Sequence, residues 1–501
     1  MLKIAEASLI SCVTAAVLAF GGTEPISFAL IEVVLLGAAA LVVFRSRNYE
    51  WAGSWSLAAI PAGLIALVAL QLLPLPRGLL RWLRPDYPAW DVDAAGGGGG
   101  KFFSLSIAPY NTKTHFILLV CCVVAFFFAR MLGQDRASRR RLMAWLLTLG
   151  TFEALYGLVQ YLSGWQKIFG YVKKYNLEEA TGTYINRNHF AGFLEMAIPF
   201  SLALVLYENS KRSRQARGVR RTFGTRAKAL LSGGNFSRMG LRVFAALAMV
   251  AGLFFSRSRM GILAGVASLA VMAIFAGVQR SAGLWLAAGV MICGIGLVFW
   301  MGAEQGFGRF ASIGDEYTSA NESRLSLWKD TVRLIEGHPL LGSGLGTFPV
   351  AFTRVQSTFP GKFVNHAHND YLEITSDLGI PAAVVFFSAI GFLLVRVARK
   401  AASGVNLGVG EDDRAAGDEQ RGESATEKKI VTGNRGRSRS SDARFARAVA
   451  VGCVGSISAM LLHSFADFNL YIPANALLFA TILGLAAAVS AADMGTLEAR
   501  L

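Results

Sequence analysis

The stretch Ile26–Phe44, ISFALIEVVLLGAAALVVF, decides the fold class of this chain. It holds a single charged residue, Glu32, and no proline. About 20 apolar residues in a helix are needed to cross the ~30 Å hydrocarbon core of a bilayer. A surface helix of a soluble protein would interrupt such a run with polar residues every turn or two. The stretch therefore predicts a transmembrane helix.

Similar apolar runs recur along the whole chain of 501 residues, and polar or basic residues bound each of them. We predict an all-α polytopic membrane protein with about twelve transmembrane helices. The first run follows Lys3 as a signal peptide would, but Gly21–Pro25 is a poor cleavage site, so we favour an uncleaved helix. The expected spans are 4–20, 26–44, 55–74, 114–129, 142–162, 189–207, 241–256, 260–278, 283–301, 379–397, 445–464 and 473–491.

The distribution of basic residues sets the orientation of these spans. With the N-terminus in the cytoplasm, about two thirds of the 49 Lys and Arg residues fall on the cytoplasmic side, as the positive-inside rule requires. Both termini are therefore expected in the cytoplasm. The net charge of +16 follows this membrane pattern, so we do not expect nucleic acid as a partner.

The spans divide the chain into five parts. Residues 1–301 hold spans one to nine, with an outside loop near 75–113. Residues 302–378 form a helical outside loop domain between spans nine and ten, and span ten covers 379–397. The polar segment 398–444 is expected to be a disordered cytoplasmic linker, because it is poor in apolar residues. Residues 445–501 hold the last two spans.

Several common cofactor and metal motifs are absent or incomplete. The run Gly96–Lys101 lacks the Ser or Thr of a phosphate loop, because Phe102 stands in that place. The glycines of Gly342–Gly346 lack the spacing of a dinucleotide fingerprint and predict a turn. No cysteine lies in a CxxC pair, so neither zinc nor a disulfide is expected. We predict no metal and no cofactor.

Polar residues gather in four clusters that the predicted topology puts on the outer face. They hold three of the six histidines, the side chains that titrate nearest neutral pH. Their arginines run against the positive-inside trend, which favours a functional interpretation. The clusters are Gly182–His189 (with Asn186, Arg187, Asn188 and His189), Ser256–Arg259 (with Arg257), Glu322–Trp328 (with Arg324) and Asn365–Glu373 (with His366, His368, Asn369 and Asp370).

The residue types in these clusters suit transfer from a phosphate-linked donor. Arginine binds phosphate bidentately and keeps its charge, so two or three arginines can stabilise a departing pyrophosphate without magnesium. A histidine can accept the proton of an attacking hydroxyl, which accelerates a reaction roughly 10²–10⁴-fold. Each residue alone also has a structural interpretation. The arginines can contact lipid phosphates or nearby carboxylates, and Asn369 or Asp370 can cap a helix.

Three carboxylates, Glu32, Glu153 and Glu195, lie inside predicted spans. Intramembrane carboxylates are functional candidates and keep a transporter hypothesis open. Glu195 follows Asn188 by seven residues, so both lie on one helix face. We expect Glu195 to support the outer cluster from below.

The chain resembles the O-antigen ligase and polymerase superfamily of bacterial membrane glycosyltransferases. The motifs that carry the resemblance are Ser106–Thr112, Asn186–Gly192, Ser258-Arg259-x-Gly261, Ser323–Trp328 followed by Pro339–Phe348, and His368-Asn369 with Gly379 further on. One position departs from the pattern of the ligases, since Ala382 stands where they have Gly, Thr or Tyr. That departure weakens the choice of ligase over polymerase.

The resemblance implies a donor, a site and a location. The donor would be a glycan linked to undecaprenyl pyrophosphate, and the acceptor a glycan, lipid A-core or another hydroxyl. His368 would be the base, with Arg187, Arg259 and Arg324 as pyrophosphate or glycan contacts. Asn186, Asn188, His189, Arg257, His366, Asn369 and Asp370 complete the predicted binding set. The site would face the periplasm from the bacterial inner membrane, within lipopolysaccharide or exopolysaccharide biosynthesis.

We therefore predict a metal-independent, inverting glycosyltransferase like the O-antigen ligases. Two alternatives stay open from the sequence. One is a polysaccharide polymerase of the same superfamily, which shares the donor and differs in the acceptor. The other is a polysaccharide or lipid flippase, which would need charges lining the spans across the whole membrane.

Overall fold

The computed structural model describes most of the chain. The described residues are 1–45, 55–83, 102–217, 234–275, 316–357, 363–403 and 426–491, with Ile292 and Gly296. The predicted span 283–301 and the glycine run 96–100 lie outside these ranges, apart from those two residues.

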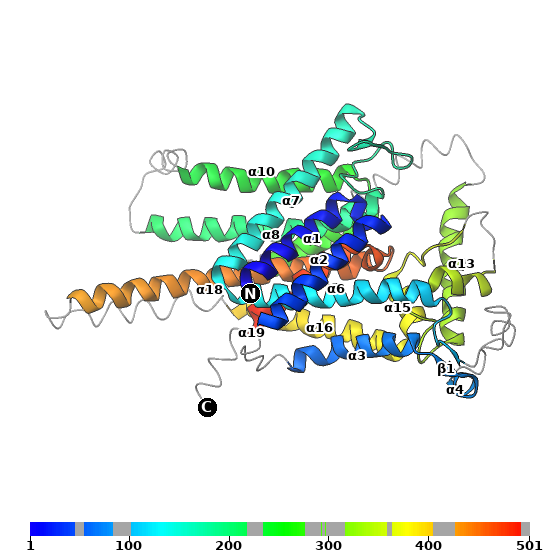
Figure 1. Cartoon of the computed structure of the whole chain (residues 1–501). Coiled ribbons are helices and arrows are strands. Elements are labelled where there is room, and N and C mark those ends of the chain that lie inside the picture. The colour runs from blue at the N-terminus through cyan, green and yellow to red at the C-terminus, as the bar shows by residue number, and fades with distance from the viewer. Residues whose placement is uncertain are drawn as a thin grey trace.

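Helices dominate the described residues, and most of them run side by side in one bundle (Figure 1). The N-terminal half holds α1 (Leu2–Leu18), η1 (Phe20–Gly22), α2 (Pro25–Arg45), α3 (Trp55–Leu72), α4 (Arg77–Leu83), α6 (Pro109–Gln134), α7 (Arg136–Ser163) and α8 (Arg187–Arg217). The rest holds α10 (Gly234–Phe255), α11 (Arg259–Phe275), α13 (Glu316–Gly337), α14 (Phe348–Ala351), η2 (Phe352–Arg354), α15 (Asp370–Leu378), α16 (Ile380–Ser403), α18 (Thr426–His463), η4 (Asn469–Tyr471) and α19 (Pro473–Ala491).

The predicted fold class is confirmed: the chain is an all-α polytopic membrane protein. Within the described residues, seven helices are long and apolar enough to cross a membrane, and three shorter apolar helices accompany them. Every predicted span that falls on described residues coincides with a helix, including the first, which is α1. The strands of the described residues form two short antiparallel pairs, β1 (Leu75–Pro76) with β2 (Phe102–Phe103) and β3 (Lys167–Ile168) with β4 (Tyr171–Val172).

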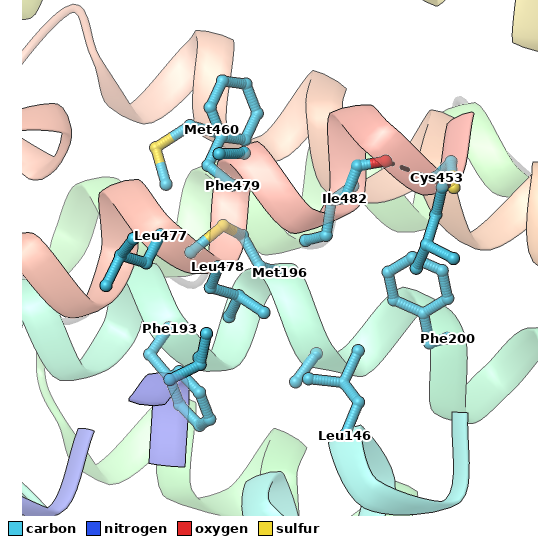
Figure 2. Close-up of a cluster of buried hydrophobic side chains, with 14 of the residues drawn as sticks. Leu146, Phe193, Met196, Phe200, Cys453, Met460, Leu477, Leu478, Phe479 and Ile482 are labelled. Carbon is cyan, nitrogen blue, oxygen red and sulfur yellow. Dashed lines mark hydrogen bonds between the residues drawn. The ribbon is translucent and has the colours of Figure 1, made fainter. Parts of the chain in front are cut away.

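The core of the bundle lies where α19 meets α8, α18 and α6. Nearly all of α19 is buried, so it is a central helix that neighbouring helices cover. Figure 2 shows Phe193 and Met196 of α8, Met460 of α18 and Leu478 of α19 in one apolar cluster. The described cysteines are free thiols, as expected of small core residues, and Cys453 points its sulfur at the Ile482 carbonyl 3.9 Å away.

Close helix approach in this core depends on glycines. A Cβ on Gly484 of α19 would lie 2.2 Å from the Phe126 carbonyl oxygen of α6. A Cβ on Gly133 of α6 would lie 2.6 Å from the Cβ of Ala488. Small residues at such crossings let two backbones approach, which is how membrane helices gain packing contacts when lipid is as apolar as their side chains.

The region predicted as an outside loop domain packs against one end of the bundle. Figure 1 shows α13 lying across that end, beside α15. Phe348 and Phe352 stack at 5.0 Å in a small separate core with Leu334. Gly342, Gly344 and Gly346 all have positive φ, so the predicted turn is present. The assignment of 302–378 to a separate periplasmic domain stays a prediction.

Both ends of the segment 398–444, which was predicted as a linker, are helical. Helix α16 continues to Ser403, and α18 begins at Thr426, well before the predicted start of its span at 445. The residues 426–444 contain no proline, and extending an existing helix costs far less than nucleating a new one. The polar composition of residues 426–444 therefore did not mark a lack of helix.

The close contact of α19 with α6 can be tested with a glycine substitution. Gly484→Val should lower the thermal unfolding midpoint of the detergent-solubilised protein, because overpacking a tight core costs roughly 1–3 kcal/mol or more. Gly391→Val is the matched control, since a Cβ at that helical glycine meets nothing within 4 Å. Equal midpoints for the two variants would show that α19 and α6 do not pack this closely.

Candidate functional site

The buried carboxylate of Asp467 is the centre of the candidate site. Three histidines from different parts of the chain surround it. The distance from Asp467 Oδ1 is 3.8 Å to His368 Nδ1 and 3.9 Å to His189 Nε2, and from Asp467 Oδ2 it is 3.7 Å to His463 Nε2. The Asp467 side chain is 1% exposed, whereas that of His368 is 40% exposed. His368 is therefore the histidine of this group that an outside reactant can reach most easily.

Three separate elements bring these histidines together. His189 lies in the first turn of α8, His463 is the last residue of α18, and His368 lies just before α15. The backbone of His368 has a φ of 48°, which is uncommon for a residue other than glycine. Such strain persists only where the surrounding structure holds it, and it occurs often at functional sites.

The negative charge of Asp467 is favoured by these neighbours. Burial alone would raise the pKa of its carboxyl group, but the interactions with His368, His189 and His463 lower that pKa below its usual range. The Phe468 backbone N–H also donates to Asp467 Oδ1 at 2.9 Å. Asp467 is therefore a carboxylate anion in reach of three imidazoles.

Below this centre, His463 binds Glu195 inside the bundle. His463 Nδ1 lies 3.0 Å from Glu195 Oε2, and both side chains are fully buried. The helices α8 and α18 pack along each other and carry one member each. The expectation that Glu195 supports the outer cluster from below agrees with this contact.

The ring of Phe468 packs against three histidines, two of which also face Asp467. His366 stacks on its ring at a centroid distance of 3.8 Å and an interplanar angle of 9°. His189 and His368 present ring edges to it at 4.8 and 5.0 Å. The packing restricts the orientation of all three imidazoles.

His366 is paired with a buried carboxyl group. Its Nδ1 lies 2.7 Å from Glu373 Oε1, and the Ala367 N–H donates to Glu373 Oε2 at 2.8 Å. Burial raises the pKa of Glu373 to about 8 and lowers the pKa of His366 to about 4. The two side chains are thus a mostly neutral hydrogen-bonded pair at pH 7, which favours a structural role for His366.

Asn369 and Asp370 attach α15 to the segment after α18. Asn369 caps α15 by accepting a hydrogen bond from Leu372 N–H, and its amide donates to the Phe465 carbonyl. Asp370 is fully buried and accepts from the Ser464 hydroxyl at 2.8 Å. Burial raises the pKa of Asp370 well above its usual value. These contacts hold His368 and Asp467 next to each other.

Two of the predicted arginines face adjacent glutamates. Arg187 forms an ion pair with Glu179, and Arg257 lies 3.7 Å from Glu178. The Ala180 N–H donates to the Phe255 carbonyl, which joins the segment before α8 to the turn between α10 and α11. The structure thus brings the clusters of Arg187 and Arg257 side by side.

The remaining predicted residues lie around these. Asn186 accepts a hydrogen bond from the Asn188 N–H at 2.9 Å, which shapes the start of α8. Arg259 begins α11, a helix that crosses α8 closely: a Cβ on Gly261 would lie 2.5 Å from the Cβ of Ala191. Arg324 is exposed on α13 and lies one turn before Trp328.

The third cluster is joined to the histidines through Trp328. Its indole N–H donates to the Ala367 carbonyl at 3.0 Å, between His366 and His368. Residues four apart lie on the same helix face, so Arg324 is on the side of α13 that faces this loop. All four predicted clusters therefore lie at one end of the bundle.

The sequence analysis missed Asp467 and Phe468 and gave His463 no role. A signal was present: His463 and Asp467 are four residues apart at the end of a predicted span, on the predicted outer side. Among the described residues, no group of three or more His, Cys, Asp or Glu side chains is arranged to hold a metal ion.

The fold and this site together define a multi-pass membrane protein with a histidine–carboxylate centre and arginines at one end of its bundle. A family model described as O-antigen ligase matches residues 244–387, which include Arg257, Arg324 and His368. The match supports the resemblance of the chain to the O-antigen ligase and polymerase superfamily. No curated protein matches the chain. The family points to polysaccharide or lipid-linked substrates in a membrane environment.

The His366–Glu373 pair predicts a pH dependence of stability. A raised carboxyl pKa means that the folded state binds more protons than the unfolded state, so stability falls as pH rises from about 4.5 to about 8. The lowered pKa of His366 has the opposite sign and makes stability rise with pH. This rise is complete above about pH 6.5, the usual pKa of histidine. Between pH 6.5 and 8, Glu373→Gln should therefore lose less thermal stability than the native protein.

The exposed Glu336 on α13 offers a matched control. Thermal unfolding midpoints of the native protein, Glu373→Gln and Glu336→Gln would be compared at pH 6.5 and 8. Equal slopes for all three would mean that Glu373 is ionised over this whole range.

Proposed function

We propose that this protein transfers a glycan from undecaprenyl pyrophosphate to an acceptor hydroxyl, as an O-antigen ligase does. The observation that carries the proposal is the accessible His368 next to the buried anion Asp467, at the bundle end that also holds the arginine clusters. The match of residues 244–387 to the O-antigen ligase family model supports a glycosyltransferase of the ligase or polymerase type. The lipid-linked donor and the acceptor are the finer parts of the proposal.

The reaction proceeds as one displacement at the anomeric carbon. The acceptor O–H gives its proton to His368 while its oxygen bonds to the anomeric carbon of the donor. The bond from that carbon to the pyrophosphate oxygen breaks, and the pyrophosphate leaves with the electron pair. A single displacement inverts the configuration at the anomeric carbon. No step in this sequence draws on a metal ion.

Asp467 sets the tautomer and orientation of the base. His368 turns Nδ1 toward Asp467, so a proton on Nδ1 is favoured and Nε2 is left as the proton acceptor. As His368 gains a proton, the Asp467 anion stabilises the imidazolium, which is the role of the carboxylate in catalytic triads. The positive φ of His368 and its contact with Phe468 further limit its rotation.

The Glu195–His463 pair positions Asp467 from the membrane side. The Nδ1 atom of His463 is hydrogen-bonded to Glu195, and its Nε2 atom faces Asp467 Oδ2 at a distance of 3.7 Å. A charged or polar group this deep in a bundle is retained only where it has partners. We assign His463 and Glu195 as positioning residues, since neither is exposed to a substrate.

The arginines stabilise the leaving pyrophosphate. Arg187 and Arg257 already pair with carboxylates, which like phosphate present anionic oxygens to a guanidinium group. A pyrophosphate carries more negative charge and competes with Glu178 and Glu179 for these guanidinium groups. Arg259 and Arg324 are proposed as further contacts to the pyrophosphate or the glycan, together with Asn186, Asn188 and His189.

A polysaccharide polymerase of the same superfamily is the nearest alternative, because it would share the donor and the base.

The flippase alternative is disfavoured by the hydrogen-bond partners of the carboxylates inside the spans. Glu153 accepts hydrogen bonds from the N–H and hydroxyl of Thr183, and Glu195 binds His463. Two of the three intramembrane carboxylates therefore form hydrogen bonds with residues that support the site. We propose the bacterial inner membrane as the location, with both termini cytoplasmic and the site periplasmic.

The role of His368 can be tested in a transfer assay with purified lipid-linked glycan, detergent-solubilised protein and EDTA. We expect His368→Ala to lower the rate roughly 10²–10⁴-fold, which is the contribution of a general base. His338→Ala is the control, because His338 lies outside the Asp467 group. Full activity of His368→Ala would exclude this residue as the base. Loss of native activity in EDTA would contradict the metal-free mechanism.

The positioning roles predict a graded series. Asp467→Asn should lower kcat nearly as far as His368→Ala, because an amide favours the wrong tautomer. Glu195→Gln should lower kcat by about tenfold with little change in KM, because it acts through His463 and Asp467. Thermal midpoints and the pH profile of kcat separate this role from a purely structural one. An unshifted pH profile in both variants would refute it.

A further inference from the structure

The segment Trp165–Leu177, which connects α7 to the start of the site, is a hairpin with an exposed aromatic surface. Its strands β3 and β4 pair antiparallel, with Lys167 opposite Val172. The mechanism above uses none of its side chains. The exposed large side chains of this segment are Trp165, Phe169, Tyr171, Val172, Tyr175 and Leu177, and we call them the aromatic hairpin surface.

These side chains are unusually exposed for their type. Tyr175 is 69% exposed and Phe169 is 49% exposed. Phe169 is at the tip of the hairpin with a φ of 50°, a strained conformation for a bulky residue. Water does not favour the exposure of so many large apolar side chains on one short segment. A contiguous apolar surface of this kind marks a contact with a partner or a membrane.

The position of the hairpin relative to the spans identifies the partner. Helix α7 is one of the candidate spans and ends at Ser163, where Gly164 in the left-handed conformation stops it. The hairpin begins at the next residue and packs beside the last turns of α7. It is therefore at the level of the boundary between membrane and water.

Aromatic contacts hold the hairpin at this level. Tyr156, in the last two turns of α7, lies 5.6 Å from the rings of both Trp165 and Phe169. Its hydroxyl accepts a hydrogen bond from the Phe169 N–H at 2.8 Å. On the other side, Tyr171 meets Phe20 edge-to-face at 5.6 Å. Phe20 begins η1, the turn between α1 and α2, so two adjacent span ends fix the hairpin.

We propose that the aromatic hairpin surface inserts into the headgroup layer of the bilayer and binds phospholipid. Trp and Tyr favour this layer because one part of the ring is apolar and the other forms hydrogen bonds. The exposed Lys167 and Lys174 flank the aromatic side chains and complement the negative charge of lipid phosphates. The lipid surface thus covers both the apolar and the basic part of the hairpin.

This contact also bears on the site, because the hairpin leads directly into Glu178 and Glu179. These glutamates pair with Arg257 and Arg187. A hairpin seated in the lipid headgroups therefore holds the arginine partners at a constant height above the membrane. The lipid contact itself does not depend on the proposed glycosyl transfer.

The experiment uses the full-length chain in nanodiscs of phosphatidylcholine whose acyl chains carry bromine near the headgroup. Bromine quenches tryptophan fluorescence at short range. We expect Tyr175→Trp to add emission that brominated lipid quenches at least twofold relative to unbrominated lipid. Trp165→Phe, a conservative change, should remove emission that is quenched to the same extent.

The control is Glu336→Trp, which places the same fluorophore on an exposed position of α13. Its added emission should be quenched by iodide in water and not by brominated lipid. Iodide quenching without bromine quenching at Tyr175→Trp would overturn the proposal. Protection from both quenchers would overturn it in favour of a protein partner or a second copy of the chain.

Discussion

Asp467 is a fully buried carboxylate, and a carboxylate keeps its charge in such a place only where positive or hydrogen-bonding groups surround it. His189, His368 and His463 supply these groups from three elements. The position of each element is therefore coupled to the same charge. Removing the carboxylate would take away the one negative charge that all three imidazoles face within 4 Å. The chemistry proposed for His368 depends on this one electrostatic constraint.

The surrounding packing explains how the constraint is met inside a membrane. Helices α8 and α18 pack along each other, which places Glu195 next to His463. Helix α19 lies almost fully buried between its neighbours, and Asn475 at its start donates to the His189 carbonyl. The apolar core thus positions the polar centre, and the polar centre in turn fixes the ends of the helices that form it.

Much of the fold was predictable because a bilayer imposes a length and a composition on each span. The expected spans on described residues are helices, and the run Ile26–Phe44 lies within α2. The polar segment 426–444, which the sequence analysis expected to lack structure, was the exception, because it is helical. Residues 426–444 carry no apolar periodicity, yet they extend α18, because helix propagation needs no burial of their side chains. Composition predicts burial better than it predicts local backbone conformation.

The site was predictable in part. Arg187, Arg257 and His368 stood out because polar groups at the predicted outer ends of spans are rare. Asp467 did not stand out, because an aspartate after a helix is common in loops and its significance lies in what surrounds it. His366 and Asp370 were predicted as substrate contacts, and the structure places them in hydrogen bonds with Glu373 and Ser464. Their contact with the glycan stays an untested prediction of the sequence.

The sequence by itself determined that this chain crosses a membrane many times, which superfamily it resembles, and which arginines and histidines lie at span ends. Only the tertiary structure decided that His189, His368 and His463 share one carboxylate and that Glu195 lies beneath them. The physical reason is one of range. Hydrophobic length and charge bias act on each span separately. The site is instead assembled by contacts between residues far apart in the chain, such as Asn475 and His189, which are 286 positions apart.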